Sequence, residues 1–417
     1  MISATQRHAT SLARQLGDHK SEVAEEFPSV NRFLWTQIDD VGPPPRRQHT
    51  MCFDPIRKRI LLFGGRNDKG VLFRDTWERG PDDWTQVSDI GPGKRFGHAI
   101  CHGGAQVGVL LFGGMDAAGF LGDTWQWKDG VWVQIEDSGP SRRFAHSMAY
   151  DLMRNRVVLF GGESSEGVQN DTWEWDPVTS KWTQVADGGP LRRANASMAY
   201  DRVFNRLVLF GGDDRSGDSF GDTWVFDQSG WIQVAHFGAP PCSSGALVGT
   251  DVQLTSFGGV QQLAPPRIAQ VLSGTWAFGE KFWTQRQDMG PSPRWGHAMA
   301  FDLTRRTLAL FGGSASLDEF GDTNGETWEH LETDPSAMGA RVAAIEIASQ
   351  AYSGAPFGLA IRMERISLYA VNLSVKWIEN PSTTPRPSRT STTPRLKASA
   401  RNRNSRCRRA NQGFRCK

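Results

Sequence analysis

The chain contains 417 residues, with 47 Lys and Arg against 45 Asp and Glu, so its formal net charge is +2. No apolar run approaches the length of a membrane span, and the N-terminal residues lack the apolar core of a signal peptide. This composition argues against a membrane partner and predicts a soluble, cytoplasmic chain. Five cysteines without metal or disulfide spacing give no reason to expect an oxidising compartment.

Residues 1–30 are expected to form an N-terminal helical or flexible segment. Leu12, Leu16, Val23 and Phe27 fall roughly on one side of a helix drawn through this segment. The pattern is typical of a helix that caps or decorates a neighbouring domain, and it does not name a function.

Residues 31–335 contain six copies of one sequence repeat. Each unit contains a double glycine, and successive copies are 49, 48, 50, 47 and 54 residues apart. The six pairs are Gly64-Gly65, Gly113-Gly114, Gly161-Gly162, Gly211-Gly212, Gly258-Gly259 and Gly312-Gly313. Each pair is followed by a Trp in a D/G/E-T-W triplet, and each unit opens on another Trp, so these positions hold twelve of the sixteen tryptophans. The regularity indicates one repeat domain.

Each repeat holds four short strand signals, which are clearest in the third unit. The strands predicted there are His146–Tyr150, Val157–Phe160, Thr172–Trp175 and Trp182–Val185. The second is a continuous apolar run, typical of a strand covered on both faces. One unit alone cannot bury its Trp and Leu-Phe faces, so the units must stack. A repeat of this length with four strands is the signature of a propeller blade.

The repeats resemble the kelch repeat in their R-x-x-H opening, their apolar run ending in Gly-Gly, their spaced Trp and their closing W-x-Q. The resemblance implies an all-β, six-bladed kelch-type β-propeller. The chain opens with an orphan fourth strand at Trp35–Ile38, whereas the sixth unit has no W-x-Q after Trp328. We therefore expect the N-terminal strand to close the last blade, which would remove the exposed sheet edges.

The start of each first strand and the loop after each double glycine are expected on one face of the propeller, because antiparallel strands alternate ends. Counting back from the residue that ends the first strand places an Arg in five units and a His in four units on this face. These residues are Arg46, Arg95, Arg143, Arg193 and Arg294, with His49, His98, His146 and His297. In the fifth unit the same count finds Ser243 and Ala246.

Two roles are open for these side chains. In kelch substrate adaptors, the arginine that enters the first strand often reaches a pocket for acidic peptides, so the resemblance makes the five arginines candidates for ligand contact. The four histidines are candidates for the same site. Alternatively, the arginines pair with the acidic residue of the G-D-T-W turns and the histidines hydrogen-bond backbone between neighbouring blades, because a residue repeated in most blades usually serves every blade.

Ligand specificity is expected in the repeats that depart from the common pattern, because binding residues are often carried by loops on a rigid scaffold. The fifth unit lacks the Arg and the His and has a longer loop over residues 261–267, which adds Arg267 to the candidate ligand contacts. The sixth unit also has a long loop, Ser314–Gly325, with three acidic residues. An asymmetric binding edge is therefore expected over the fifth and sixth blades.

The kelch resemblance also embraces galactose oxidase, a copper radical enzyme, and a few carbohydrate-modifying enzymes. Such a copper site requires two tyrosines, two histidines and a cysteine crosslinked to one tyrosine. The chain has four tyrosines and no adjacent Tyr-His pair, and it shows no Ser-His-Asp order, phosphate loop or zinc motif. No catalytic residue, metal ligand or cofactor is predicted, although a site assembled from several blades leaves no local pattern.

Two segments follow the repeats. Residues 336–380 alternate apolar and polar side chains without matching the repeat, which predicts a small β-rich appendage of three or four strands. Residues 381–417 are rich in Ser, Thr, Pro and Arg and are expected to form a disordered basic tail. From Arg386 to Lys417 there are eleven basic and no acidic residues, so a nucleic-acid partner is expected only through this tail. The alternatives are a solvated tail or a segment translated out of frame.

The sequence thus predicts a recognition scaffold that binds a protein partner first, and carbohydrate second, through the face that carries the arginines. A galactose-oxidase-like or other carbohydrate-modifying enzyme is the alternative. In a third hypothesis the propeller only displays the N-terminal segment and the tail.

Overall fold

The computed structural model describes residues 35–39, 41–81, 83–104, 106–136, 138–263, 268–287, 290–318, 321–331, 345–350, 356–367 and 370–377. The chain divides into two compact units, Met1–Met338 and Gly339–Lys417. The predicted N-terminal helix, the basic tail and Arg267 lie outside the described residues. No helix within these ranges is long and apolar enough to cross a membrane.

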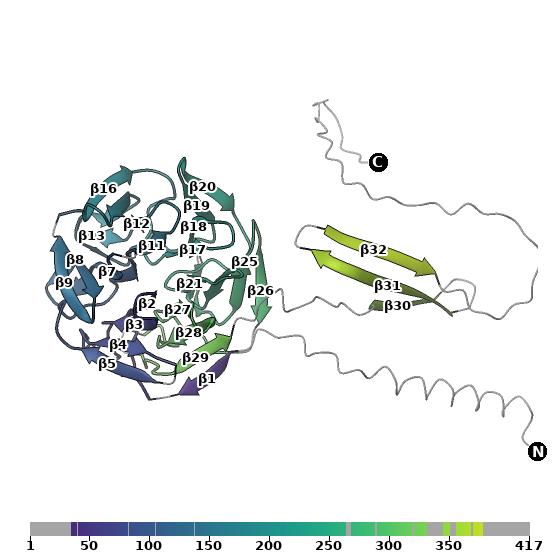
Figure 1. The fold of residues 1–417 in the computed structure, drawn as a ribbon, viewed down its shortest axis with the longest axis horizontal. Coiled ribbons are helices and arrows are strands. Elements are labelled where there is room, and N and C mark those ends of the chain that lie inside the picture. The colour runs from purple at the N-terminus through teal and green to yellow at the C-terminus, as the bar shows by residue number, and fades with distance from the viewer. Residues whose placement is uncertain are drawn as a thin grey trace, which may run out of the picture. The chain divides into compact units, whose positions relative to one another are not determined.

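The first unit contains six four-stranded antiparallel sheets, which surround a common centre in Figure 1. The first three are β2 (Thr50–Asp54), β3 (Arg59–Phe63), β4 (Thr76–Arg79) and β5 (Trp84–Ser88); β6 (Ala99–His102), β7 (Val109–Asp116), β8 (Gly119–Lys128) and β9 (Val131–Glu136); and β11 (Ser147–Asp151), β12 (Arg156–Phe160), β15 (Thr172–Asp176) and β16 (Lys181–Ala186). Each sheet comes from one sequence repeat, and its strands pair in the order of the chain.

The other three sheets follow the same order, with one exception in the last. They are β17 (Ser197–Asp201), β18 (Arg206–Phe210), β19 (Thr223–Asp227) and β20 (Gly230–Ala235); β21 (Ala246–Gly249), β22 (Leu254–Phe257), β25 (Thr275–Phe278) and β26 (Trp283–Gln287); and β27 (Ala298–Asp302), β28 (Thr307–Phe311), β29 (Thr327–Leu331) and β1 (Thr36–Asp39). The sixth sheet thus takes its last strand from the other end of the sequence.

The third sheet shows how the repeat produces its strands. Each of its four strands lies within one residue of the range predicted from the sequence. The apolar run Val157–Phe160 of β12 is buried throughout, between β11 and β15. The double glycine then ends β12, because Gly161 has φ of +64° and a Cβ there would lie 2.6 Å from the carbonyl oxygen of Arg193. Glycine accepts this conformation and this close approach without steric cost.

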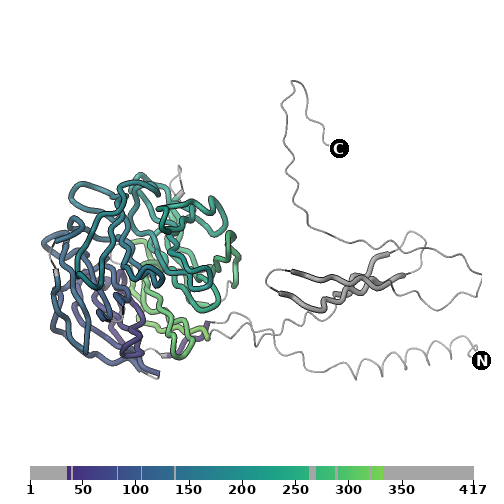
Figure 2. Tube along the Cα trace, turned by 45° about the horizontal axis from the view of Figure 1, so that its top comes forward, coloured from purple at the N-terminus to yellow at the C-terminus, as the bar shows by residue number. Residues whose placement is uncertain are grey.

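The N-terminal strand β1 occupies the position of a fourth strand in the sixth sheet. It pairs antiparallel with β29, with Thr36 opposite Glu329 and Gln37 opposite Trp328. The strand that we predicted at Trp35–Ile38 is therefore β1, displaced by one residue. Figure 2 shows the first sheets, drawn in purple, beside the last sheet, drawn in green.

Neighbouring sheets are joined by a tryptophan that lies within one residue of the start of each outer strand. Its indole N–H donates a hydrogen bond to the threonine hydroxyl of the D/G/E-T-W triplet in the preceding sheet, over 2.8 to 3.1 Å. The pairs are Trp84 with Thr327, Trp132 with Thr76, Trp182 with Thr124, Trp231 with Thr172, Trp283 with Thr223 and Trp35 with Thr275. Each of these indoles also packs against a phenylalanine of the preceding sheet, as Trp182 does on Phe112 with centroids 5.3 Å apart.

A second set of contacts joins the sheets near the centre. Six residues that precede the inner strands have φ between 54° and 64°, and each backbone N–H donates to the carbonyl of its counterpart in the preceding sheet over 2.6 to 2.9 Å. These residues are Gln48, Gly97, Ala145, Asn195, Ser244 and Gly296. The last of the six bonds, from Gln48 to Gly296, returns to the start, so the hydrogen bonds form a ring.

Shorter strands decorate the first unit, and a separate sheet forms the second. β10 (Arg143–Phe144), β13 (Glu163–Ser164) and β14 (Gly167–Val168) form one small sheet, while β23 (Val260–Leu263) and β24 (Ile268–Val271) form a hairpin in the long loop of the fifth repeat. In the second unit β30 (Ile345–Gln350), β31 (Pro356–Ser367) and β32 (Ala370–Trp377) form an antiparallel sheet.

The packing between sheets predicts that Gly139→Ala destabilises the first unit by about 1–3 kcal/mol, the usual cost of overpacking. A Cβ at this position would lie 2.6 Å from Cδ1 of Trp182, and the φ of +146° disfavours any side chain. The free energy of unfolding from urea titrations measures the effect. Gly188→Ala is the matched control, because Gly188 lies in the corresponding linker and a Cβ added there would meet no atom within 4 Å. Equal losses in the two variants would contradict the prediction.

Candidate ligand-binding face

One face of the first unit carries the segments that enter the inner strands and the loops that follow the double glycines; we call it the strand-1 face. The two kinds of segment lie side by side, since Phe96 bridges to Met115 and Trp295 to Ser314 by antiparallel backbone pairing. This placement agrees with the alternation of strand ends expected from the sequence.

In five sheets an arginine at this face forms a clamp between three parts of the repeat. In the third sheet, Arg143 donates to both carboxylate oxygens of Asp171 over 2.6 and 2.7 Å, to the carbonyl of Gly161 over 2.8 Å and to the carbonyl of Ser141 over 2.9 Å. The other clamps are Arg46 with Asp75, Arg95 with Asp123, Arg193 with Asp222 and Arg294 with Glu326. Each clamp therefore fixes the entering segment to the double glycine and to the turn before the third strand.

A tryptophan completes each clamp. The indole of Trp173 donates to the Asp171 carboxylate over 2.7 Å, and the same contact recurs in the other four sheets. Burial alone would raise the pKa of Asp171, but the hydrogen bond and charge of Arg143, joined by Trp173, lower it below its usual 3.8. The clamp thus holds an ionised carboxylate against a buried guanidinium.

The five arginines predicted for ligand contact are all turned into the protein. Arg46, Arg95, Arg143, Arg193 and Arg294 are between 0% and 2% exposed. The alternative role, pairing with the acidic residue of the turn, matches the bonds in four sheets with Asp and in the sixth with Glu326. Ligand contact by these arginines stays a prediction. Their positive charges are already balanced in place.

The four predicted histidines are also buried, with exposures from 3% to 6%. His146 packs edge-on against Phe112, and its Cε1 lies 3.2 Å from a Cβ position on Gly113 of the preceding sheet. His49, His98 and His297 make the same contact with a phenylalanine of their preceding sheets. Burial, followed by the charge of the neighbouring arginine, lowers the pKa of His146 to about 3, so the ring is neutral. These rings act as spacers between sheets.

The fifth sheet corrects one sequence assignment. The backbone of Cys242, not Ser243, takes the clamp position, because its carbonyl accepts from Gly212 as the carbonyl of Arg193 does from Gly162. Likewise Gly245, not Ala246, stands in the histidine position against Gly259. Counting back from Asp251 is one residue out, because Thr250 holds the position of the aspartate that ends the inner strand in the third sheet. The Thr250 hydroxyl accepts from the backbone N–H groups two and three residues later, as the Asp151 carboxylate does.

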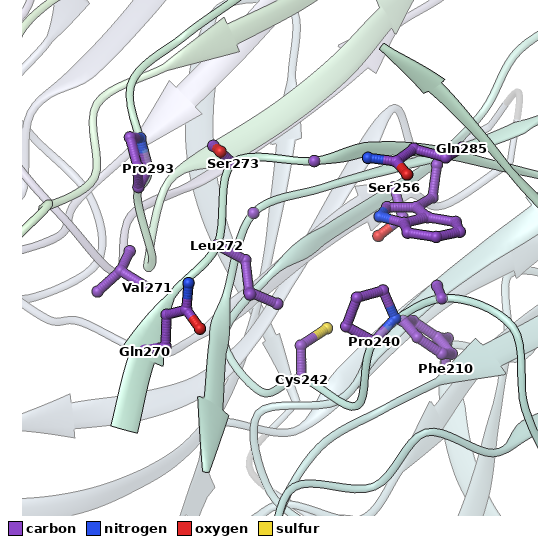
Figure 3. Close-up of a pocket in the computed structure, with 14 residues that line it drawn as sticks. Phe210, Pro240, Cys242, Ser256, Gln270, Val271, Leu272, Ser273, Gln285 and Pro293 are labelled. Atoms are coloured by element: carbon purple, nitrogen blue, oxygen red, sulfur yellow. The ribbon is translucent and has the colours of Figure 1, made fainter. Parts of the chain in front are cut away.

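The missing clamp leaves a pocket of about 240 Å³ in the fifth sheet. Cys242 stands in place of the arginine and Gly274 in place of the acidic residue, so both partners are absent together. Figure 3 shows Ser256 and Gln285 on one side of this pocket and Cys242 with Phe210 on another. None of the described residues that line it is charged. Among the described residues, nothing accepts a hydrogen bond from the indole of Trp276, whose counterparts all donate to a carboxylate.

Sequence reasoning missed a second feature of this face, an aromatic and arginine cluster over the first four sheets. Phe144 packs against Phe96 and Phe120, with ring centroids 6.1 and 5.7 Å apart. The guanidinium of Arg66 lies over Phe96 at 4.7 Å, and that of Arg215 lies over Phe144 at 5.8 Å. The signal lay in the residue after each clamp arginine, which is Phe in the second and third repeats.

The described residues do not contain a group of three or more His, Cys, Asp and Glu placed to hold a metal ion. In the long loop of the sixth repeat, the indole of Trp295 donates to the carbonyl of Ser316 over 2.7 Å. Arg47, next to a clamp arginine, is fully buried and lies over Trp295 at 4.9 Å. This loop is therefore tied to the linkers that enter the first and sixth sheets.

The repeated sheets and their clamps define a class of protein, a β-propeller assembled from kelch-like repeats. The model of the KLHDC2/KLHL20/DRC7 Kelch-repeats domain matches the chain three times, at residues 26–191, 82–259 and 154–343. The chain belongs to this kelch-repeat family, as its repeats predicted. A solved structure titled "Structure of YjhT" shares the fold with a TM-score of 0.55 and 14% identity, over 69% of this chain and 95% of that chain. No curated protein matches the sequence.

The clamp geometry predicts that Arg143→Met costs about 3 kcal/mol in the free energy of unfolding, because it leaves the Asp171 carboxylate unpaired. The double variant Arg143→Cys with Asp171→Gly copies the pair found in the fifth sheet. It is expected to lose less than the sum of its two single variants, by about 1 kcal/mol or more. Urea titrations of all four proteins measure this coupling, and strict additivity would contradict the clamp.

The lowered pKa of Asp171 also predicts a pH dependence. Its stabilising contribution is complete above the unfolded value of 3.8 and is lost as pH falls through the lower folded value. In Arg143→Met the carboxylate is relieved by protonation, so the gap in unfolding free energy from wild type should shrink between about pH 7 and about pH 3.5. A gap that stays constant over this interval would show that the charge is not the cause. Adding Asp171→Asn to Arg143→Met should remove this part of the pH dependence.

Proposed function

We propose that this chain is a recognition scaffold, in which the six sheets form a closed six-bladed propeller and the strand-1 face binds a protein partner. The pocket in the fifth sheet is the observation that carries the proposal. Loss of the arginine or the acidic residue alone would leave an unpaired buried charge, which is strongly unfavourable. The absence of both residues leaves an uncharged pocket at the position that the arginine and the acidic side chain of the clamp fill in the other five sheets.

The pocket suits one neutral side chain of a partner. Its volume of about 240 Å³ is below the range usual for drug-sized ligands. Leu272 and Pro240 offer apolar surface, while the amide of Gln270 can hydrogen-bond a polar side chain. An apolar or amide side chain fits this lining better than an acidic one, because the clamp arginines of the face are already paired with Asp or Glu.

The five clamps support binding by holding the loops of the strand-1 face in fixed positions. A loop that is already ordered loses less conformational entropy when a partner binds. The clamp in the sixth sheet, between Arg294 and Glu326, borders the pocket through the linker at Pro293. Variants that break this clamp are expected to weaken binding without touching the partner.

The cluster of Phe96, Phe144, Arg66 and Arg215 forms a second part of the proposed interface. Aromatic and arginine side chains dominate binding energy at many protein interfaces. Phe96, Phe144 and Arg66 are partly exposed and Arg215 is exposed, so a partner can reach part of each side chain. Both arginines are held in place, Arg66 by Gln48 over 2.8 Å and Arg215 by Glu163 over 2.9 Å. The cluster lies over the first four sheets and the pocket over the fifth, so an extended segment of the partner would cross the face.

The proposal predicts that filling the pocket abolishes partner binding. Cys242→Arg with Gly274→Asp restores the pair that the sister sheets carry, and Leu272→Phe introduces the residue found at the same position in the first and fourth repeats. We expect the full-length wild type to capture a defined protein from native lysate, and both filled variants to lose it by about tenfold or more, a loss typical of a buried anchor. Mass spectrometry of the captured material, normalised to bait, gives the measurement.

Met153→Lys is the control, since Met153 lies 71% exposed in a hairpin at the other ends of the strands. This variant should keep the partner. Thermal unfolding monitors the fold of every variant, and Leu272→Phe serves if the double substitution does not fold. Retention of the partner by folded, filled proteins would reject the pocket as the site. Selective capture of glycans on an array, without a protein partner, would favour carbohydrate recognition.

A further inference from the structure

A second cavity, of about 300 Å³, lies among the inner strands and is lined by residues from all six sheets. We call it the axial cavity. One wall of the cavity is formed by the second residue of each inner strand. These six residues are Met51, Ile100, Met148, Met198, Leu247 and Met299. Four methionines give this wall a flexible, polarisable surface that adapts to ligands of irregular shape.

Aromatic rings line the part of the axial cavity nearer the hairpins that join the first and second strands. Phe53, Tyr150, Tyr200 and Phe301 stand there, at positions two residues beyond the apolar wall. The ring of His102 packs edge-on against Tyr150, with centroids 4.8 Å apart. These hairpins lie at the ends of the inner strands remote from the strand-1 face, so the axial cavity is distinct from the fifth-sheet pocket.

Arg202 is the only Lys or Arg among the described residues that line the axial cavity. It follows the aspartate that ends β17, at a position where the first, third and sixth repeats carry Pro55, Leu152 and Leu303, all of which also line the cavity. No carboxylate side chain of the described residues lines the cavity. Asp251 is the nearby acidic group, but its carboxylate is already 3.4 Å from Arg306. Within the described part of the chain, Arg202 forms no ion pair and its guanidinium makes no hydrogen bond.

His102 offers a second polar group to the same space. Its Nε2 is buried and has no hydrogen-bond partner among the described residues. Burial, and then the charge of Arg202, lowers the pKa of His102 to about 4, so the imidazole is neutral at physiological pH. A neutral ring nitrogen can donate or accept a hydrogen bond according to its tautomer.

We propose that the axial cavity binds a small aromatic carboxylate, with its ring against the methionine wall and its carboxylate on Arg202. The lining supplies apolar surface for one end of such a molecule and an uncompensated guanidinium for the other. A planar guanidinium matches a carboxylate in bidentate geometry. His102 lines the same cavity with a buried, unpartnered Nε2 and is assigned here as the second hydrogen-bonding group for the ligand. A neutral aromatic molecule would leave Arg202 without an anion, and an aliphatic dianion would leave the apolar wall uncovered.

Calorimetric titration of the full-length protein with 1-naphthoate tests the proposal, with 1-naphthalenemethanol as the uncharged analogue of the same size. We expect saturable 1:1 binding of naphthoate, about tenfold tighter than the alcohol, since a hydrogen bond to a charged group contributes that much. Arg202→Leu should reduce naphthoate affinity to the level of the alcohol and leave the alcohol unchanged. Leucine stands at this position in two sister repeats, so the fold should tolerate it.

Arg59→Leu is the matched control, because it removes one positive charge at the same end of the strands outside the cavity lining. Arg202→Lys keeps a cation without the planar fork and should bind with intermediate affinity. Absence of naphthoate binding to wild type, equal affinity for the two probes, or undiminished binding to folded Arg202→Leu would each overturn the proposal. If Arg202→Leu does not fold, Arg202→Lys and the comparison of the two probes on wild type decide it.

Discussion

The contact on which the rest of the structure depends is the tryptophan that joins each sheet to the one before it. Its indole fills the gap beside a buried phenylalanine, and its N–H satisfies a threonine hydroxyl that would otherwise be buried without a donor. The glycine of each linker is required by the same contact, because any side chain there would collide with the indole. The tryptophan thus buries apolar surface, donates to the buried threonine hydroxyl and sets the distance between neighbouring sheets. Each of the six repeats makes the same three contributions.

The clamps on the strand-1 face solve a different problem. The double glycines allow sharp turns but leave their carbonyls and the entering segments without regular strand pairing. A buried arginine, neutralised by a nearby carboxylate, bonds to both. Such a pair is costly to break from one side, so its loss in the fifth sheet is tolerated only because both partners are absent. The fifth sheet therefore lacks the whole clamp and not one half of it. The proposed interface centres on the neutral pocket that remains there.

The sequence was informative wherever one repeat could be compared with another. The regular double glycines and tryptophans predicted the strands of the third sheet to within a residue, and the orphan N-terminal strand was visible because the sixth repeat lacks its own. The role of the arginines could not be decided in this way, because ligand contact and internal pairing require the same residue at the same place. The structure shows Arg143 buried and paired with Asp171, which is the internal role, whereas ligand contact stays a prediction. Counting also failed at Ser243, because Thr250 and not Asp251 holds the position of the aspartate that ends the inner strand.

Other features depend on contacts between repeats, which no single repeat encodes. The linker glycine Gly139 looks like part of a turn until Trp182 is seen to lie on it. The axial cavity draws its lining from six repeats, and Arg202 was indistinguishable from other basic hairpin residues. Its distinction is relative, since it stands where sister repeats carry apolar side chains. The aromatic cluster around Phe144 similarly needs three loops to be placed together.

The pairing of β1 with β29 has a consequence for biosynthesis. The strand β1 leaves the ribosome well before its hydrogen-bonding partner β29, because the paired residues Thr36 and Glu329 are almost 300 residues apart in the chain. At translation rates of about 5–20 residues per second, this strand waits about 15–60 s for its partner. During that interval its backbone groups are open to other strands, and Trp35 has no completed sheet to enter. The sixth sheet therefore cannot be completed until β29 has been synthesised, whatever the state of the five sheets before it.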